Sequence, residues 1–119
     1  MKENLIRDKS FCFAVRIVNF YKYLIRKKEF VMSKQLLRSG TSIGANIEEA
    51  LGGQTKKDFI YKLSISYKEA RETKYWIKLL KETNFINQEE FLSIYNDCDE
   101  LCKIIGKIQI TMKNQIRNP

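Results

Sequence analysis

The stretch KDFIYKLSISYKEARETKYWIKLLKE, residues 57–82, predicts one long amphipathic helix. Its apolar and small residues recur at alternating spacings of four and three, the period of one helix face; they are Phe59, Leu63, Ser66, Ala70, Thr73, Ile77 and Leu80. Thr55, with Asp58 three residues later, forms an N-terminal cap pattern, and Asn84 marks the end of the helix. At about 1.5 Å per residue the helix is roughly 40 Å long, so several helices of similar length must cover its apolar face.

The preceding segment, residues 30–51, contains two glycines and several Ser, Thr and Asn residues in SKQLLRSGTSIGANIEEAL. Each glycine costs about 1 kcal/mol in a helix interior, so propensity alone predicts a loop at residues 39–44. The spacing of four and three nevertheless continues through the segment, at Leu36, Gly40, Ile43 and Ile47. We therefore predict a continuous helix whose small residues let a neighbouring backbone approach closely, ended by the Gly52–Gly53 pair.

Helical periodicity also covers residues 10–28 and the segment after Asn87. The first follows a short polar lead at residues 1–9, and its predicted buried stripe comprises Phe11, Ala14 or Val15, Val18, Tyr21 or Lys22, and Leu24 or Ile25. In the last segment Asn87 and Glu90 form a capping-box pattern, and the apolar period runs almost to the C-terminus. Because the connections are short, we predict an all-α fold, one antiparallel up-and-down four-helix bundle over residues 1–119.

The composition is that of one globular domain of 119 residues, 44% of them hydrophobic. No apolar run approaches the roughly twenty residues needed to cross a bilayer, and the start MKENLIRDK lacks the apolar region of a secretory signal. We expect a cytoplasmic protein with no membrane association. The three cysteines, Cys12, Cys98 and Cys102, are interpreted as buried small hydrophobic residues, because a metal site would need further ligands in a chain without histidine.

The absence of histidine also argues against catalysis. There is no imidazole base, no Ser-His or Cys-His pair, and no Glu-x-x-His half-site of a bundle di-iron centre. The segment GTSIGAN lacks the Gly-Lys-Ser/Thr ending of a phosphate loop. The acidic residues at 48–49 and 97–100 fit an exposed acidic face better than an acid–base pair. We predict a protein that is not an enzyme and needs no cofactor or metal.

The net charge of +8 is unevenly distributed along the chain. Residues 1–38 hold ten Lys or Arg against three acids, and residues 54–84 hold eight against four, whereas the other two segments carry a slight acidic excess. Such asymmetry favours a polyanionic partner, although lysine-rich faces also occur simply as solvated surface.

Two blocks, QLLRSGTSIGANIEEA at residues 35–50 and KDFIYKLSISYKEARETKYWIKLL at residues 57–80, resemble the four-helix bundle family of 23S rRNA intervening-sequence proteins. That family is encoded within inserts in large-subunit rRNA genes or elsewhere in bacterial genomes. It is structurally similar to the accessory protein of diversity-generating retroelements. The resemblance implies a homopentameric barrel of up-and-down bundles, a basic surface, and nucleic-acid binding as the expected role.

Several polar positions of this sequence match the family's two blocks. They are Arg38, Ser42, Asn46 and Glu49 in the first block and Glu69, Arg71, Glu72 and Thr73 in the second. The first four lie along one strip of a helix. One interpretation is an interhelical hydrogen-bond network that sets bundle register or subunit packing; the other is a ligand-facing strip with Arg38 on a phosphate.

Our functional hypothesis is weak binding of RNA or DNA with little sequence preference, through phosphate contacts. The candidate residues form two groups: Lys22, Arg26, Lys27, Lys28, Lys34 and Arg38 near one end of the bundle, and Lys68, Arg71 and Lys74 as a second stripe. Tyr61, Tyr67, Tyr75 and Trp76 are assigned to core or interface rather than to base stacking, unless they are exposed.

The alternative hypothesis is a ring-forming scaffold that docks a protein partner, with basic residues only solubilising its surface. In both cases we expect self-association as a homo-oligomer, a pentamer by resemblance. Apolar positions such as Ile65 and Leu79 lie outside the main stripe and would be covered by another subunit.

Overall fold

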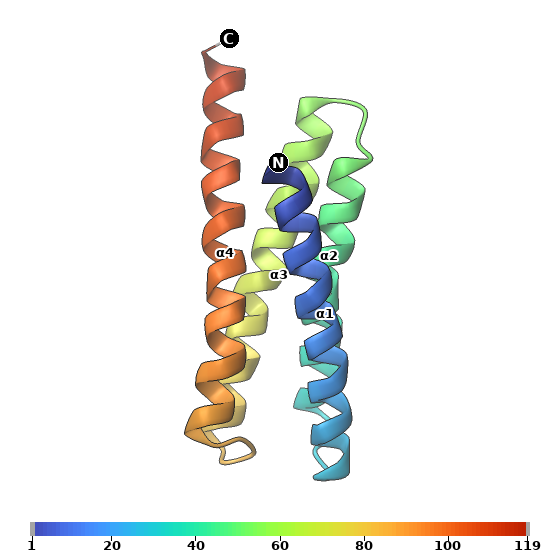
Figure 1. Ribbon diagram of the computed structural model, residues 1–119, viewed down its shortest axis with the longest axis vertical. Coiled ribbons are helices and arrows are strands. Elements are labelled where there is room, and N and C mark those ends of the chain that lie inside the picture. The colour runs from blue at the N-terminus through green and yellow to red at the C-terminus, as the bar shows by residue number, and fades with distance from the viewer. Residues whose placement is uncertain (1, 119) are drawn as a thin grey trace.

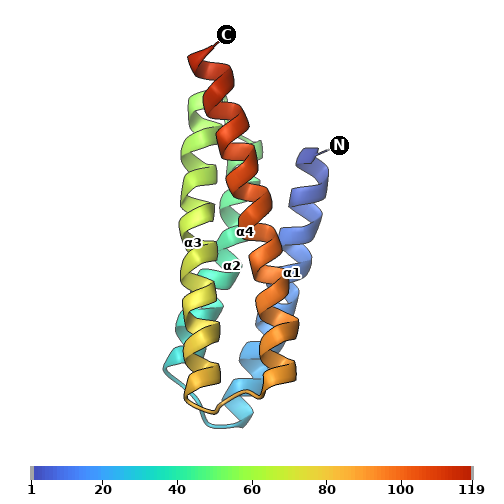
Figure 2. The same cartoon turned by 90° about the vertical axis from the view of Figure 1, so that its left-hand side faces the viewer.

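The computed structural model describes residues 2–118, with side chains from residue 5 onward, as four α-helices in a bundle (Figure 1). The helices run up and down and bring both termini to the same end of an elongated molecule measuring 51 × 22 × 21 Å (Figure 2). They are α1 (Lys2–Arg26), α2 (Met32–Leu51), α3 (Lys56–Glu82) and α4 (Gln88–Arg117). The predicted all-α, antiparallel four-helix bundle is confirmed. Along residues 2–118 no helix combines the length and apolar content needed to span a membrane.

The first helix differs from the prediction in its start and in its buried face. It begins at Lys2 rather than Ser10, because Ile6 extends the apolar face into the supposed polar lead. The buried positions are Ile6, Ser10, Phe13, Ile17 and Leu24. Of the predicted stripe only Leu24 is buried, and the prediction was wrong for Phe11, which is 68% exposed. The helix carries two stripes with helical spacing, the predicted one that begins at Phe11 and the buried one. The buried stripe includes Ser10, which a search for apolar residues alone does not find.

The prediction of a continuous second helix through residues 39–44 is confirmed. A Cβ at Gly40 would lie 2.7 Å from Ile17 Cγ1, and one at Gly44 would lie 3.2 Å from the Ser10 carbonyl oxygen. Gly40 therefore receives a core side chain of α1, and Gly44 receives the α1 backbone itself. The tolerance of this helix for glycine has a packing cause, because close contact with α1 compensates the unfavourable propensity.

The interface between α2 and α3 is partly polar although it is fully buried. Thr73 Oγ1 is hydrogen-bonded to Ser39 Oγ at 2.9 Å, and Ser66 donates to the Ile43 carbonyl oxygen at 2.8 Å. Each of these hydroxyls has a partner, so their burial carries no unsatisfied group. Small side chains on both helices keep the two axes close.

The helix ends are closed by local side-chain hydrogen bonds. The buried carboxylate of Glu29 accepts the backbone N–H groups of Val31, Met32 and Ser33 at the start of α2, where the helix dipole favours a negative charge. Asn87 forms the predicted capping box with Glu90 at the start of α4. The predicted Thr55 cap also forms.

Lys28 and Asn84 adopt left-handed backbone conformations, with φ of 65° and 68°. They follow the ends of α1 and α3, the usual place for a residue with positive φ after a helix. Asn84 was predicted to end its helix. The first helix was predicted to run to Lys28 but ends at Arg26, and lysine carries no sequence signal for the left-handed conformation.

The cysteine prediction is correct for two residues and wrong for one. Cys98 and Cys102 are buried, and the Cys98 thiol donates to the Ala70 carbonyl oxygen at 3.4 Å. Burial raises the pKa of both thiols, so they stay protonated and unreactive. Cys12 is exposed, because it lies on the face of α1 that turns away from the bundle.

We expect Gly40→Ala to lower the free energy of unfolding by about 1–2 kcal/mol, because its methyl group displaces Ile17 in a packed core. The gain in helix propensity, about 1 kcal/mol, offsets only part of that cost. Urea denaturation followed by circular dichroism, at one protein concentration, measures the change.

Gly52→Ala serves as the control, since its nearest neighbours are carbonyl oxygens at 3.7 Å and beyond. This variant should be as stable as the wild type or slightly more stable. If Gly40→Ala were as stable as Gly52→Ala, the close approach of α1 and α2 at Gly40 would not be a packing constraint.

Candidate nucleic-acid interface

At least one ion pair bridges every pair of neighbouring helices. We call the solvent-exposed line along which two neighbouring helices meet their seam. The bridges are Arg7–Glu48 (2.8 Å) between α1 and α2, Lys9–Glu100 (2.7 Å) and Arg16–Asp97 between α1 and α4, Lys62–Glu49 (2.7 Å) and Arg38–Glu69 (3.3 Å) between α2 and α3, and Lys74–Asp99 (2.8 Å) between α3 and α4. Arg38 also pairs with Glu72, and Lys103 with Asp99 at 3.0 Å within α4. The seams therefore collect charges of both signs in equal number.

These pairs use seven of the 22 Lys and Arg residues and seven of the 14 Asp and Glu residues. The net charge of +8 consequently resides on residues outside the pairs. Six of the nine predicted cations are exposed and make no ion pair with any side chain that the structure describes: Lys22, Arg26, Lys28, Lys34, Lys68 and Arg71. The other three are engaged in holding the bundle together.

Lys22, Arg26, Lys28 and Lys34 lie where α1 ends and α2 begins, at the lower end of the molecule in Figure 1. The helical hairpin brings them to one end of the bundle, as the sequence-based hypothesis required. Lys27 belongs to the same segment but has another role. Its Nζ donates to the Phe85 carbonyl oxygen in the α3–α4 connection and lies 5.1 Å from the centre of the Tyr23 ring.

Arg38 is held across the α2–α3 seam rather than facing a ligand. Its guanidinium group pairs with Glu69 and Glu72, and Glu72 also accepts a hydrogen bond from Trp76 Nε1 at 2.9 Å. The two carboxylates neutralise Arg38, so its proposed contact with phosphate has lost its electrostatic basis.

The other polar positions of the first block divide between two roles. Glu49 forms an interhelical pair with Lys62. Ser42 and Asn46 instead bond to the backbone of their own helix, at 2.6 Å to the Arg38 carbonyl oxygen and 2.8 Å to the Ser42 carbonyl oxygen. The predicted interhelical network is therefore correct for Arg38 and Glu49 and wrong for the two residues between them.

Lys74 does not lie on one face with Lys68 and Arg71, as the second predicted stripe assumed. Its hydrogen bond to Asp99 ties α3 to α4 and raises the pKa of the Lys74 ammonium group. Its Nζ also lies 5.4 Å from the centre of the Tyr95 ring. Hydrogen bonds from Lys74 and Lys103 lower the pKa of Asp99 below its usual range.

The exposed face of α3 instead carries a strip that repeats at spacings of four and three, which we call the α3 outer strip. It consists of Lys57, Tyr61, Ser64, Lys68, Arg71, Tyr75 and Lys78. Each member stands two residues before a residue of the apolar stripe that begins at Phe59, about 200° around the helix. Sequence reasoning missed Lys57 and Lys78, although this offset was present in the sequence.

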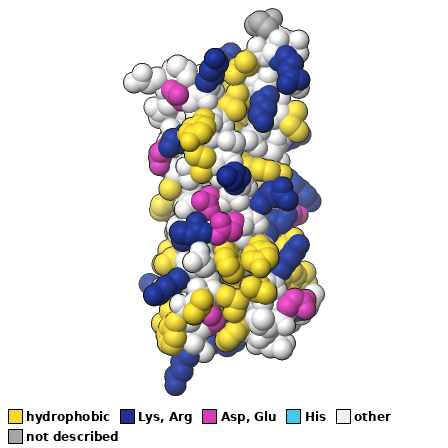
Figure 3. All heavy atoms as spheres, turned by 180° about the vertical axis from the view of Figure 1, so that it is seen from behind, with side chains coloured by type: hydrophobic (Ala, Val, Ile, Leu, Met, Phe, Trp, Pro, Cys, Tyr) yellow, Lys and Arg dark blue, Asp and Glu magenta, His cyan; other side chains and the backbone are white. Residues whose placement is uncertain are grey.

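The α3 outer strip contains cationic, aromatic and hydroxyl side chains and no acid. Figure 3 shows the side of the molecule on which α3 lies, with basic side chains spread along the molecule and hydrophobic and acidic ones among them. The acidic residues Glu69 and Glu72 belong to the neighbouring α2–α3 seam, where Arg38 holds them.

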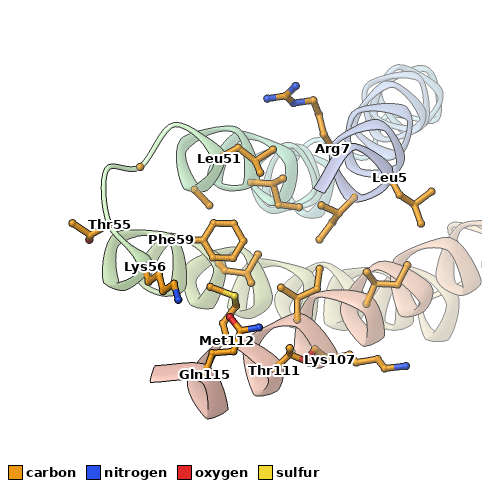
Figure 4. A pocket seen from close by; sticks show the side chains of 17 residues that line it. Leu5, Arg7, Leu51, Thr55, Lys56, Phe59, Lys107, Thr111, Met112 and Gln115 are labelled. Atoms are coloured by element: carbon orange, nitrogen blue, oxygen red, sulfur yellow. The ribbon is translucent and has the colours of Figure 1, made fainter. Parts of the chain in front are cut away.

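A hollow of about 820 Å³ lies where the start of α1 and the end of α4 diverge (Figure 4). Its wall is mostly apolar, and Phe59 points into it while the charged end of Lys107 points away. No acid, cysteine or histidine lines it. Among the described side chains, no three His, Cys, Asp or Glu residues gather as a metal site requires.

Fold and surface together define a small basic four-helix bundle protein whose seams are closed by ion pairs. The chain belongs to the 23S rRNA-intervening sequence protein family, whose family model matches residues 2–107. A similar solved structure is that of a protein with unknown function from the S23 ribosomal protein family of Bacteroides thetaiotaomicron VPI-5482. The two chains are 57% identical, with a TM-score of 0.90 over 92% of this chain and 98% of that one. No curated protein matches the sequence.

We expect the unfolding free energy of Asp99→Asn to fall less than that of the wild type as the pH is lowered into the acidic range. The folded-state pKa of Asp99 lies below its unfolded value of about 3.9, so its contribution is present above that pH and is lost as pH falls through the folded pKa. The wild type should exceed the variant in unfolding free energy by up to about 1 kcal/mol near neutral pH, and the gap should close as pH falls through the folded-state pKa of Asp99.

Urea denaturation from about pH 7 down to about pH 2 measures this gap. Glu82→Gln, which removes an exposed carboxylate at the end of α3, should keep the wild-type pH profile. Parallel profiles for the wild type and Asp99→Asn would show that the Lys74–Asp99 pair does not stabilise the bundle.

Proposed function

We propose that the protein is a non-catalytic nucleic-acid-binding protein that acts as a homo-oligomer and has little sequence preference. The observation that carries this proposal is the separation of charge on the surface. Seven of the 14 acids are paired with cations, nearly all across the helix seams, whereas six of the candidate cations face solvent along α3 and at the junction of α1 and α2 without an ion pair to any described side chain. Such an arrangement suits a polyanion that lies across the surface.

Lys and Arg side chains that project from helix faces suit phosphates rather than base edges. Phosphate contacts supply affinity and orientation but carry no sequence information. The family description refers to a sequence that intervenes in 23S rRNA, which makes RNA the first partner to test and DNA the second. Self-association would repeat the basic surfaces around the assembly, and for a pentamer we rely on family resemblance.

Lys34 offers the cleanest test of phosphate binding. It lies in the first turn of α2, which contains no acidic residue, so Lys34→Glu places a carboxylate at the positive end of the helix dipole and retains the fold. We expect this variant to bind RNA and DNA oligonucleotides several-fold more weakly, by about the same factor for unrelated sequences. Wild-type affinity should fall with salt with a log–log slope of about −0.9 per duplex phosphate or −0.7 per single-strand phosphate.

Fluorescence anisotropy in about 50–200 mM salt measures both effects. Lys107→Glu, an equal change of charge on an exposed residue of α4, should bind nearly as well as the wild type. Lys27 is unsuitable as a test site, because its reversal also breaks the hydrogen bond to Phe85. Absence of wild-type binding to both nucleic acids at about 50 mM salt would refute the proposed function.

A second candidate function is a scaffold that assembles and docks a protein partner. The observation in its favour is the outer face of α1, where Phe11 is 68% and Val15 46% exposed, one helical turn apart. Apolar side chains of this size on the face opposite the core suit burial by another subunit. This candidate predicts assembly without salt-dependent binding of nucleic acid.

We expect Phe11→Ser combined with Val15→Ser to dissociate the oligomer toward the monomer mass of 14.1 kDa. Light scattering at micromolar concentration measures the mass. Val31→Ser, which changes an exposed valine in the α1–α2 connection, should leave the mass unchanged. A wild-type protein that ran as a monomer would contradict self-association and this use of the α1 face.

A further inference from the structure

Two tyrosines of the α3 outer strip are exposed without an evident structural reason. Tyr61 is 63% and Tyr75 56% exposed, whereas Tyr67 and Trp76 of the same helix pack against the core. Aromatic rings gain stability from burial, so two exposed rings on one face of one helix suggest an external partner.

The two rings and the cations between them form an ordered series. Tyr61 and Tyr75 are fourteen residues apart, a distance of about 21 Å along the helix axis. Exposed Lys68 and Arg71 lie between them, and Lys57 and Lys78 extend the series at its two ends. One partner that runs along α3 would meet a cation before, between and after the rings.

Neighbouring side chains restrict both rings. The Tyr75 ring stands edge-on to Trp76, with centres 5.1 Å apart, and Trp76 is itself anchored by its hydrogen bond to Glu72. Lys62 Nζ lies 6.0 Å from the centre of the Tyr61 ring, and Glu49 holds that lysine at 2.7 Å. The rings are therefore partly preorganised, which lowers the entropy cost of stacking a ligand on them.

The strip widens into a groove at its upper end, where the start of α3 meets the end of α4. The groove has a volume of about 600 Å³ and is lined by Lys57, Ile60, Tyr61, Ser64, Lys113, Ile116 and Arg117. Three cations surround one aromatic ring there, and no acid lines the groove. This composition suits a phosphate together with an adjacent flat apolar group.

We infer that the α3 outer strip, with this groove, is a track for single-stranded nucleic acid, an inference that rests on the proposed function. A single strand presents the faces of its bases, so Tyr61 and Tyr75 stack on them while the cations contact the phosphates between. A duplex hides those faces within its own stack and uses the cations alone. Single strands are therefore the preferred form.

The test compares one oligonucleotide sequence as a single strand and as a duplex, by fluorescence anisotropy at about 50 mM salt. The variant Tyr61→Leu combined with Tyr75→Leu keeps apolar bulk but removes both stacking faces. We expect it to lose at least about tenfold in affinity for the single strand and less than about twofold for the duplex. Leu92→Ala, a change of an exposed apolar side chain of α4 outside the strip and the groove, should leave both affinities unchanged.

Arg71→Gln provides a second variant that keeps both rings, and it should weaken binding of the single strand and the duplex alike. A third measurement uses only the wild-type protein, by photocrosslinking the single strand and mapping the attached peptides by mass spectrometry. Crosslinks at Tyr61 or Tyr75 are expected. This result stays informative if the double tyrosine variant folds or assembles poorly.

The outcomes separate the inference from the proposed function. Three results would overturn the track and leave the proposed function in place. They are salt-dependent binding that is tighter for the duplex, salt-dependent binding that the double tyrosine variant does not change, and crosslinks found only at the α1–α2 junction. No binding to either form would overturn both.

Discussion

The bundle depends on the close approach of α1 and α2 at Gly40 and Gly44. A Cβ at Gly40 would lie 2.7 Å from Ile17 Cγ1 and one at Gly44 would lie 3.2 Å from the Ser10 carbonyl oxygen, so a larger residue at either position forces Ile17 or the α1 backbone to shift. The contact fixes the rotation of α2, which then presents Ser39 to Thr73 and the Ile43 carbonyl oxygen to α3. The glycines that weaken the helix by propensity are thus the residues that lock it into the tertiary structure.

The rotation of α2 also determines the electrostatics of the surface. It sets Arg38 over Glu69 and Glu72 and sets Glu49 beside Lys62, so charges of both signs are paired along the α2–α3 seam. Similar pairs close the other three seams. Exposed ion pairs add little stability individually, yet they set opposite charges beside each other in the seams and leave the excess cations to the outer faces.

The third helix serves the core and the surface with two stripes of the same period. The residues of the α3 outer strip precede the core residues by two positions, which places them on opposite sides of one cylinder. The same helix that organises the hydrophobic core therefore presents a row of cations and tyrosines, interrupted by the partly exposed Ser64, to solvent. The length of α3 follows from the core that the helix covers, and the exposed row is as long as the helix.

The sequence by itself determined the number of helices, their antiparallel order, the continuity of the glycine-rich segment and the caps at Thr55 and Asn87. These features depend on periodicity and on hydrogen bonds between residues close in the chain, both of which are visible without partners. Only the tertiary structure decided which face of α1 is buried, that Cys12 is exposed, and which cations are free. Lys27, Arg38 and Lys74 look like Lys22 or Lys68 in the sequence, but each meets an oxygen acceptor from a distant segment that packing alone brings within reach.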